Sequence, residues 1–407
     1  MSQSIAPVDV GNPVRFYGIL IAISTIGPLA MNIFVPSIPG LMHEFSVSSG
    51  TVQLTLTIYL AGLAVSQLFY GPLSDRFGRR PVLLWGLALY VVSSGICSLA
   101  TSIEALTVAR FVQAIGGASG MVLSRAIVRD LHGREAAASV LGYITMAWVL
   151  VPMFAPALGG LLDEIDSWRT SFYVLSGFGT CVLLLVAWGL PETNPRDGRD
   201  LSEANRLLSG MAALIKEPVF IAYTLTLGFC SAIFFSFLAG APFLMVEVMG
   251  YSPLDYGLWF MLISVGYMTG NFLSGRYSQR IGIDRMITIG NGLALVGAIA
   301  MLLVGTLGTL TPLTLFGFML FVTLGNGLTV PNGMAAAISV LPRTVGAAAG
   351  LSGFSQIGIG AAASQLTGTL QGSFAITTLW VMIAGAILAG LVHHFMLRSV
   401  RGRPREF

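Results

Sequence analysis

Charged side chains are scarce in this sequence, and two groups of them stand out against apolar surroundings. The first lies in YGPLSDRFGRR (70–80), where one carboxylate and three arginines fall within six positions. The second is Arg110 with Gln113, three residues apart and therefore on one face of a helix. A carboxylate among arginines can form a network of ion pairs, and a guanidinium beside an amide can bind a polar ligand.

The composition places both groups in a membrane protein. Charged residues are 10% of the 407 positions, against about 25% in a soluble domain, and apolar residues are 55%. Cys97, Cys181 and Cys230 lie in separate apolar stretches, which argues against disulfides and against a metal site. No charge run suits nucleic acid, no phosphate-binding loop or cofactor site is predicted, and the N-terminus lacks the features of a cleaved signal peptide. We therefore do not expect an enzyme or an ATP-driven pump.

Twelve apolar stretches are long enough to cross about 30 Å of hydrocarbon as helices. A polar segment separates the first six stretches from the last six. The expected fold is an all-α integral membrane protein with a six-helix bundle in 1–190, a cytoplasmic linker in 191–218 and a second six-helix bundle in 219–407. The stretches are predicted at 16–38, 51–71, 82–100, 104–128, 137–160, 171–190, 219–246, 255–275, 286–306, 311–336, 346–369 and 376–397.

Basic residues predict the orientation of these helices. If the N-terminus is cytoplasmic, 18 of the 21 Lys and Arg residues fall in segments that meet the cytoplasm. Cytoplasmic loops of membrane proteins are enriched in Lys and Arg. We therefore expect the N-terminus, the linker and the C-terminus on the cytoplasmic side.

The second half of the chain weakly repeats the first charged group. GRYSQRIGIDR (275–285) aligns with 71–81 at an offset of 204 residues, so that Gly71 matches Gly275 and Gly78 matches Gly282. Gln279 stands opposite Asp75, so the repeat lacks the carboxylate. Internal repeats of this kind build many transporter folds, and they predict two pseudo-symmetric bundles.

Several motifs, in order along the chain, resemble those of the major facilitator superfamily. GPLSDRFGRRP (71–81) resembles its signature loop, RFVQAIGGASG (110–120) its fourth-helix motif, and VPMFAPALGG (151–160) its fifth-helix antiporter motif. MNIFVPSIPG (31–40) resembles the first-helix motif of the Bcr/CflA group of drug-resistance exporters. The resemblance implies alternating access between two bundles and export of small molecules, usually against a proton gradient.

The signature loop implies a latch between the bundles. In the superfamily its carboxylate contacts the start of the eleventh helix and arginines at the end of the fourth, which closes the cytoplasmic side. Gly71, Pro72 and Gly78 are expected to form a tight turn, and Arg79 and Arg80 to be solvated anchors. The alternative is a solvated charge cluster without a latch. The expected latch residues are Gly71, Asp75, Arg76, Arg125, Arg129 and Asp130.

A substrate cavity is expected between the bundles. Arg110 lies deep in a predicted span, where a charge should face the protein interior or water. The alternatives are that Arg110 extends to the membrane surface, that Gln113 only bonds a neighbouring helix, and that Phe234 and Phe235 face lipid. The predicted substrate-binding residues are Asn32, Tyr59, Arg110, Gln113, Met121, Tyr143, Phe234, Phe235 and Asn326.

Proton coupling is the least determined property. Many relatives in the Bcr/CflA group carry Asp where Asn32 stands, and the resemblance implies that such a carboxylate carries protons. Asn32 cannot titrate, and no Asp or Glu lies in the middle of a predicted helix. Either protons couple through an acid near a helix end, with Asp130 and Glu247 favoured, or the protein is a facilitator without proton coupling.

The leading hypothesis is a monomeric exporter in a bacterial inner membrane that exchanges small amphipathic drugs for protons. A second hypothesis is an exporter of one metabolite, such as a sugar or amino-acid derivative. A hypothesis from a different class is a membrane sensor that does not transport, although such a protein would normally add a soluble domain, and none is predicted.

Overall fold

A computed structural model of the protein describes residues 13–131, 134–194, 209–341, 344–371 and 376–396. Within these ranges the chain forms α-helices with short 3-10 and π turns, and it contains no strand. Eleven of the described helices are long and apolar enough to cross a membrane. The chain is therefore an all-α, multi-pass membrane protein.

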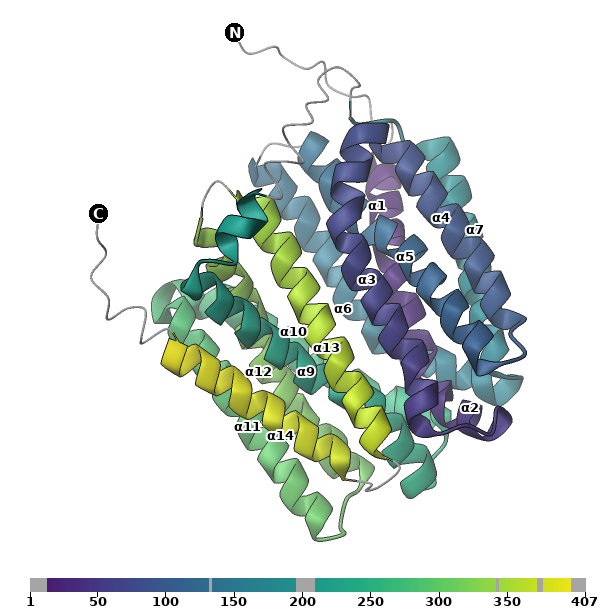
Figure 1. Cartoon of the computed structure of the whole chain (residues 1–407), viewed down its shortest axis with the longest axis vertical. Helices are drawn as coiled ribbons and strands as arrows, with labels where there is room; N and C mark the ends of the chain where they lie inside the picture. The colour runs from purple at the N-terminus through teal and green to yellow at the C-terminus, as the bar shows by residue number, and fades with distance from the viewer. Residues whose placement is uncertain (1–12, 132–133, 195–208, 342–343, 372–375, 397–407) are drawn as a thin grey trace.

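Two sets of helices make up the structure (Figure 1). The first set is α1 (Pro13–Ile33), η1 (Val35–Ser37), α2 (Ile38–Glu44), α3 (Ser49–Phe77), α4 (Arg79–Ser98), α5 (Ile103–Leu131), α6 (Arg134–Ile165) and α7 (Trp168–Gly189). The second set is α9 (Pro218–Phe243), η2 (Leu244–Val248), α10 (Pro253–Ile281), α11 (Ile283–Thr306), α12 (Pro312–Ser339), α13 (Val345–Gln371), α14 (Thr377–Leu391) and η4 (Val392–Met396).

Each predicted span has a matching helix in the described residues, but the count of exactly twelve membrane spans is not confirmed. The exception is α10, whose 29 residues are long enough to cross a bilayer. It is not among the eleven helices that satisfy both length and apolarity. Its Tyr, Ser, Thr and Asn residues lower its mean hydropathy, although the helix packs among the others.

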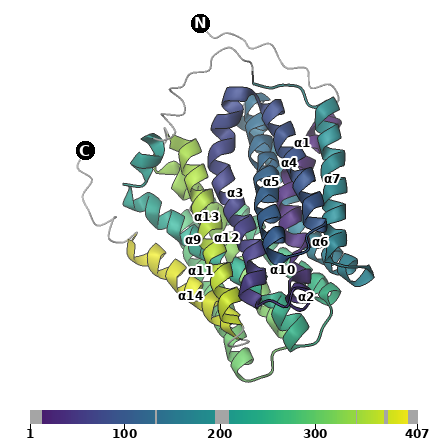
Figure 2. The same cartoon turned by 45° about the vertical axis from the view of Figure 1, so that its right-hand side comes forward.

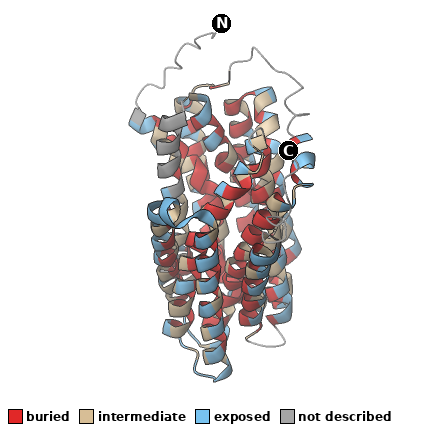
Figure 3. Cartoon of the chain, turned by 90° about the vertical axis from the view of Figure 1, so that its left-hand side faces the viewer, coloured by how far each residue is buried: buried red, intermediate tan, exposed pale blue. Residues whose placement is uncertain are grey.

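The outer surface of the helices suits lipid. Buried residues fill the interior of the helix array, and exposed residues lie on its outside (Figure 3). Many of the exposed side chains are large and apolar, such as Trp85, Phe272 and Trp188, which are 78%, 72% and 77% exposed. Patches of this kind are rare on monomeric soluble proteins, whereas hydrocarbon solvates them well.

The two sets of helices meet mainly along two helix pairs, with smaller contacts of η1 and α2 against α9 and of η1 against α10. α3 packs against α13, and α6 packs against α10 (Figures 1 and 2). Small residues permit the second contact, because a Cβ on Gly160 would collide with the backbone of Pro253, and one on Gly257 with the backbone of Ala157. Glycines at a helix interface let two backbones approach closely.

Matching glycine turns link α3 to α4 and α10 to α11. Gly78 and Gly282 have φ of 98° and 90°, a backbone conformation that glycine adopts without steric penalty. The prediction of a turn that begins at Gly71 is wrong, because Gly71 and Pro72 lie within α3 and Gly78 alone reverses the chain. We call the end of the molecule with Gly78 and Gly282 the Gly78 end, and the opposite end, where α3 begins, the Gly50 end.

Candidate functional site

A fully buried arginine lies inside the first set of helices. Arg110 is 0% exposed, and its Nη1 donates to the carbonyl oxygen of Ala30 at 3.0 Å and to Oε1 of Gln113 at 2.6 Å. Gln113 donates from Nε2 to Oγ of Ser94 on α4 at 2.7 Å. The alternative in which Arg110 extends to the membrane surface is therefore wrong. Gln113 bonds a neighbouring helix and also orients the guanidinium.

Aromatic rings surround the Arg110 guanidinium. Its Cζ lies 4.0 Å from the ring centre of Tyr59, 5.0 Å from that of Phe34 and 5.7 Å from that of Phe172. The faces of aromatic rings attract cations, which partly offsets the loss of water. Among the described residues no carboxylate forms an ion pair with Arg110, and its Nε and Nη2 are buried without a hydrogen-bond partner.

One short part of α1 joins several of the predicted substrate residues. The Tyr59 hydroxyl donates to the carbonyl oxygen of Gly27 at 2.9 Å, and the Met121 side chain packs against Gly27. Asn32 donates from Nδ2 to the carbonyl oxygen of Pro28 at 2.8 Å, while its Oδ1 is buried and has no partner among the described residues. The structure thus brings Tyr59 and Met121 to the face of α1 that also accepts a bond from Arg110, whereas Asn32, within the described chain, bonds only its own helix.

The predicted residues of the second half form a separate group. Phe234 and Phe235 on α9 have ring centres 5.4 Å apart, and the Phe234 ring lies 6.4 Å from that of Phe260 on α10. Phe235 is 9% exposed, so the lipid-facing alternative is wrong for it. Asn326 donates from Nδ2 to the carbonyl oxygen of Cys230 at 3.4 Å, and its buried Oδ1 has no partner in the described chain. The side chain of Tyr143 lies outside the described part of the structure.

The signature motif forms an ion-pair network at the Gly78 end, with Arg79 at its centre. Arg79 is 9% exposed, and its guanidinium pairs with Asp75 and, from Nε, with Oδ2 of Asp130 at 2.8 Å. Its Nη1 also donates to Oγ of Ser74 at 2.6 Å. The prediction of Arg79 as a solvated anchor is therefore wrong. The network ties α3, α4 and α5 together within the first set of helices.

Sequence reasoning missed two residues that support this network. The Glu192 carboxylate accepts from the backbone N–H groups of Arg79 at 2.9 Å and Arg80 at 3.1 Å, which caps the start of α4. Asn194 donates from Nδ2 to the carbonyl oxygens of Ser74 and Asp75 at the end of α3. Their position directly after an apolar span, in PETN (191–194), is the signal that could have found them.

The other predicted latch residues do not join the Arg79 network. Arg80, predicted as a solvated anchor and not as a latch residue, donates from Nη2 to the carbonyl oxygen of Ala187 at 2.6 Å. The Arg125 guanidinium lies 4.2 Å from the ring centre of Trp148, and that of Arg76 lies 5.2 Å from the ring centre of Phe77. Arg129 is exposed. Gly71 has open space around the position that a Cβ would take. Among the described residues, no hydrogen bond joins any of these side chains to the second half of the molecule.

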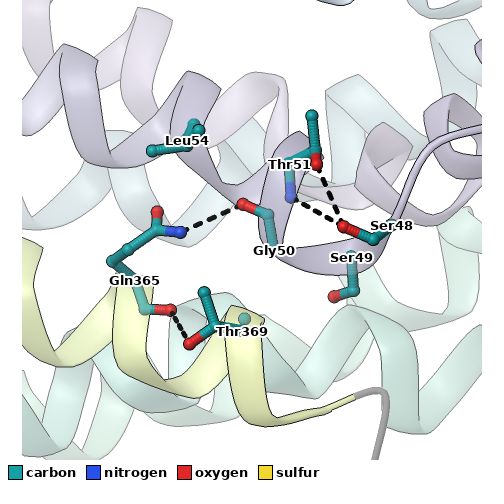
Figure 4. Close-up of a pocket in the computed structure, with 8 residues that line it drawn as sticks. Ser48, Ser49, Gly50, Thr51, Leu54, Gln365 and Thr369 are labelled. Atoms are coloured by element: carbon teal, nitrogen blue, oxygen red, sulfur yellow. Dashed lines mark hydrogen bonds between the residues drawn. The ribbon is translucent and has the colours of Figure 1, made fainter.

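The hydrogen bonds that do join the halves lie at the Gly50 end. Gln53 Nε2 donates to Oγ of Ser364 at 2.7 Å, and Gln365 Nε2 donates to the carbonyl oxygen of Gly50 at 3.0 Å. The second bond crosses a pocket of about 280 Å³ lined mainly by polar residues of α3 and α13 (Figure 4). Glu164 on α6 accepts from the backbone N–H of Leu254 at 3.3 Å.

Glu247, one of the two acids predicted for proton coupling, takes part in the same contact region. Its Oε1 lies 3.0 Å from Nε2 of His43 on α2, in the other half of the molecule. Asp130, the other predicted acid, is held by Arg79 at the opposite end. The structure therefore places the two acids at opposite ends of the helix array. No cluster of His, Cys, Asp or Glu among the described residues suits a metal ion.

Comparison with known proteins identifies the family. The family model described as Major Facilitator Superfamily matches residues 20–365. The chain belongs to the Major Facilitator Superfamily. It is 32% identical to the uncharacterized MFS-type transporter YdgK of Bacillus subtilis, covering 91% of this chain and 92% of that protein.

Relatives within the superfamily carry drug-resistance names. Multidrug resistance protein D of Escherichia coli is 30% identical, over 88% of this chain and 90% of the relative. A bicyclomycin resistance protein homolog of Haemophilus influenzae is 28% identical, over 94% of this chain and 96% of the relative. These names agree with the resemblance to drug-resistance exporters that the sequence motifs indicated.

A solved structure confirms the superfamily fold. A bacterial homolog of the human lysosomal transporter Spinster, in an inward-facing and unoccupied conformation, superimposes with a TM-score of 0.75 at 18% identity. The superposition covers 96% of this chain and 98% of that one. The helix array described above is therefore the major facilitator fold.

Proposed function

We propose that the protein is a secondary exporter of small amphipathic drugs in a bacterial inner membrane. It works as a monomer by alternating access, with residues 1–190 and 219–407 as the two moving units and 191–218 as the cytoplasmic linker. The drug-resistance names of its relatives support the substrate class. The observation that carries the transport cycle is that the hydrogen bonds between the halves, among the described residues, all lie at one end.

Four hydrogen bonds join the two halves in the described residues, and all four lie at the Gly50 end. At the Gly78 end, Asp75 and Asp130 pair with Arg79 in their own half. Such an arrangement supports a state closed at the Gly50 end and open at the Gly78 end. Because basic residues concentrate at the Gly78 end, we place that end, both termini and the opening in the cytoplasm.

In the opposite state the Gly78 end closes. The exposed Arg76 and Arg129 and the 43%-exposed carboxylate of Asp75 are the charges available to meet the start of α13. Each exposed pair contributes about 1 kcal/mol or less, and a network contributes more. The proposed latch therefore changes the ratio of the two states, whereas apolar packing holds the fold. Its residues are Gly71, Asp75, Arg76, Arg125, Arg129 and Asp130.

We also propose that transport is coupled to protons through an acid near a helix end. Glu247 is favoured over Asp130 because its partner, His43, belongs to the other half. Because the bond joins the two halves, opening of the Gly50 end would break it and expose both side chains. A carboxylate whose partner leaves during the cycle has the property that proton exchange requires.

The test is drug-driven proton movement in proteoliposomes that contain the full-length protein. We expect an imposed pH gradient to drive uptake of a neutral drug, and Glu247→Gln to uncouple that uptake from the gradient. Arg110→Ala should abolish transport at a normal protein level, and Asp130→Asn serves as the comparison at the other end. Drug transport that ignores the pH gradient in the wild type would make the protein a facilitator. Transport of no drug, with exchange of one metabolite, would overturn drug export.

A further inference from the structure

A groove lies on the outer surface of the first set of helices, between the adjacent helices α4 and α5 (Figure 1), at the Gly50 end. It encloses about 470 Å³, within the range of about 300–1,000 Å³ that sites for small molecules occupy. Ile96 of α4 and Val108 of α5 line the groove and are 52% and 65% exposed. Because α4 and α5 are both membrane spans, the groove opens into lipid.

The walls of the groove are apolar. Ala105 and Ala109, four positions apart on one face of α5, leave space beside α4 because their side chains are small. Ser93 also lines the groove, but its hydroxyl donates to carbonyl oxygens of its own helix, those of Leu89 at 2.6 Å and Tyr90 at 3.1 Å. This hydroxyl is satisfied without a ligand, so a hydrocarbon chain is the group that matches the walls.

One carboxylate stands at the mouth of the groove. Glu104 lines it, is exposed, and lies in the first turn of α5. Among the described residues Glu104 has no hydrogen bond and no ion pair. Val112 lines the groove eight positions further on, so the groove runs about 12 Å inward from the carboxylate. Half of the hydrocarbon thickness is about 15 Å, so a chain in this groove belongs to one leaflet and has its headgroup at Glu104.

The charges at this end favour a cationic headgroup. The described arginines toward the Gly50 end are Arg169 and Arg110. Arg169 pairs with Glu44 at 2.7 Å and donates to the carbonyl oxygen of Ala100 at 3.1 Å, and Arg110 is buried. An anionic headgroup would therefore meet the Glu104 carboxylate with no unengaged arginine of the described chain to offset the repulsion. An ethanolamine ammonium group supplies a positive charge and three N–H donors, which a carboxylate accepts in charge-assisted hydrogen bonds.

The position of Glu104 also stabilises α5 itself, since a carboxylate in the first turn interacts favourably with the helix dipole. That interaction requires no ligand and does not account for the groove. It is also the same whichever lipid surrounds the protein. A preference for one headgroup therefore separates a lipid site from a purely local role of Glu104.

We propose that the groove between α4 and α5 binds one phosphatidylethanolamine molecule from the leaflet at the Gly50 end. An acyl chain fills the apolar walls, and the ammonium group pairs with Glu104 while the phosphate faces water. The site lies on α4 and α5, whereas α3 and α6 make the main contacts with the second set of helices. It is therefore a site for a membrane lipid that accompanies the protein, and it does not depend on drug export.

The test is competition between lipids for the groove of the full-length protein in nanodiscs of phosphatidylcholine. A trace of phosphatidylethanolamine with a photoreactive diazirine in its acyl chain labels the protein, and the adducts on segment 93–112 are measured by peptide mass spectrometry. Unlabelled phosphatidylethanolamine or phosphatidylglycerol with identical acyl chains competes. We expect the ethanolamine lipid to compete about two- to fivefold better than the glycerol lipid, which is the effect of one exposed ion pair.

Two variants with matched controls locate the site. Glu104→Gln keeps the shape and removes the charge, so the two lipids should then compete equally. Asp166→Asn removes one exposed negative charge at the same end but outside the groove, and it should keep the wild-type preference. Val108→Trp fills the groove and should lower the labelling of segment 93–112 to the level seen on α11. Val296→Trp, at a valine that is 67% exposed on α11, should leave the labelling of 93–112 unchanged.

Each outcome bears on one part of the proposal. Equal competition by the two lipids in the wild type, or an unchanged preference in Glu104→Gln, overturns the role of the headgroup and of Glu104. Wild-type labelling of 93–112 that does not exceed labelling around Val296 overturns the groove as a lipid site, as it would if a second copy of the chain covered it. All four substitutions are at exposed positions, where changes in stability are usually small, so each variant is expected to fold.

Discussion

The bond between Gln53 and Ser364 offers a quantitative test of how the Gly50 end is held shut. Both side chains are buried, at 1% and 0% exposed, and the amide donates to the hydroxyl at 2.7 Å between α3 and α13. Opening this end replaces the bond with contacts to water. Removing one partner should therefore shift the equilibrium toward the state in which the Gly50 end is open.

The two single variants should shift the equilibrium between the closed and open states by different amounts. Ser364→Ala leaves the Gln53 amide buried without an acceptor in the closed state, which costs about 1–3 kcal/mol, or roughly a 5- to 150-fold change in the ratio of states. Gln53→Ala leaves a serine hydroxyl on a helix, where it can bond a carbonyl oxygen one turn earlier at little cost. The double variant isolates the coupling energy, which should be about 1 kcal/mol.

The assay is the distance between spin labels across the Gly50 end, at Ser46 in the first half and Tyr251 in the second, in a protein without its native cysteines. Thr367→Val is the matched control, because that buried hydroxyl on α13 bonds its own helix, at the carbonyl oxygen of Ala363. The reasoning fails if Ser364→Ala and Thr367→Val give the same distance distribution. It also fails if the coupling energy is zero, since the bond would then not contribute to closure.

Three further predictions concern the Gly78 end and the orientation. Arg79→Ala should lower the free energy of unfolding by about 1–3 kcal/mol, seen as a lower melting temperature in detergent, because two carboxylates lose their partner; Arg76→Ala, which removes an exposed arginine, should have little effect. Glu192→Ala should destabilise the protein by about 1 kcal/mol through loss of the α4 cap, and Glu192→Gln by less; equal stability of both variants and the wild type would argue against the cap. Cysteine at Ser46 should react with an impermeant reagent outside intact cells while cysteine at Arg276 does not, and the reverse pattern would invert the proposed orientation.

The helices were predictable because hydrocarbon thickness sets their length and apolarity marks them. The helix ends within the signature motif (71–81) were not predictable. A run with Asp75 and Arg76 suggested a loop, yet α3 continues to Phe77, because charged side chains on a helix end can still reach water. Only Gly78 has the backbone conformation that ends the helix. Charge in the sequence therefore located the membrane surface, and glycine located the turn.

Whether a charged residue is buried or solvated was predictable only where one energetic cost, such as exposing a charge to lipid, dominated. Arg110 was expected to face the interior because its depth makes exposure to lipid costly, and it is buried. Arg79 was expected to be solvated, but its partners Asp130 and Glu192 come from positions 51 and 113 residues later in the chain. No local pattern shows such distant pairs, so the network required the three-dimensional structure.

The glycine contact between α6 and α10 has a geometrical consequence for the size of the opening. Because Gly160 and Gly257 bring two backbones together near one end, this contact can act as a fulcrum. From Gly160 to its start at Arg134, α6 spans about 39 Å, so a tilt of about 10° at the fulcrum moves the far end by about 7 Å. That displacement exceeds the diameter of about 5 Å of the cylinder on which the Cα atoms of a helix lie. In the proposed transport cycle, a small rotation at this tightly packed joint would therefore produce a much larger displacement at the opposite end of α6.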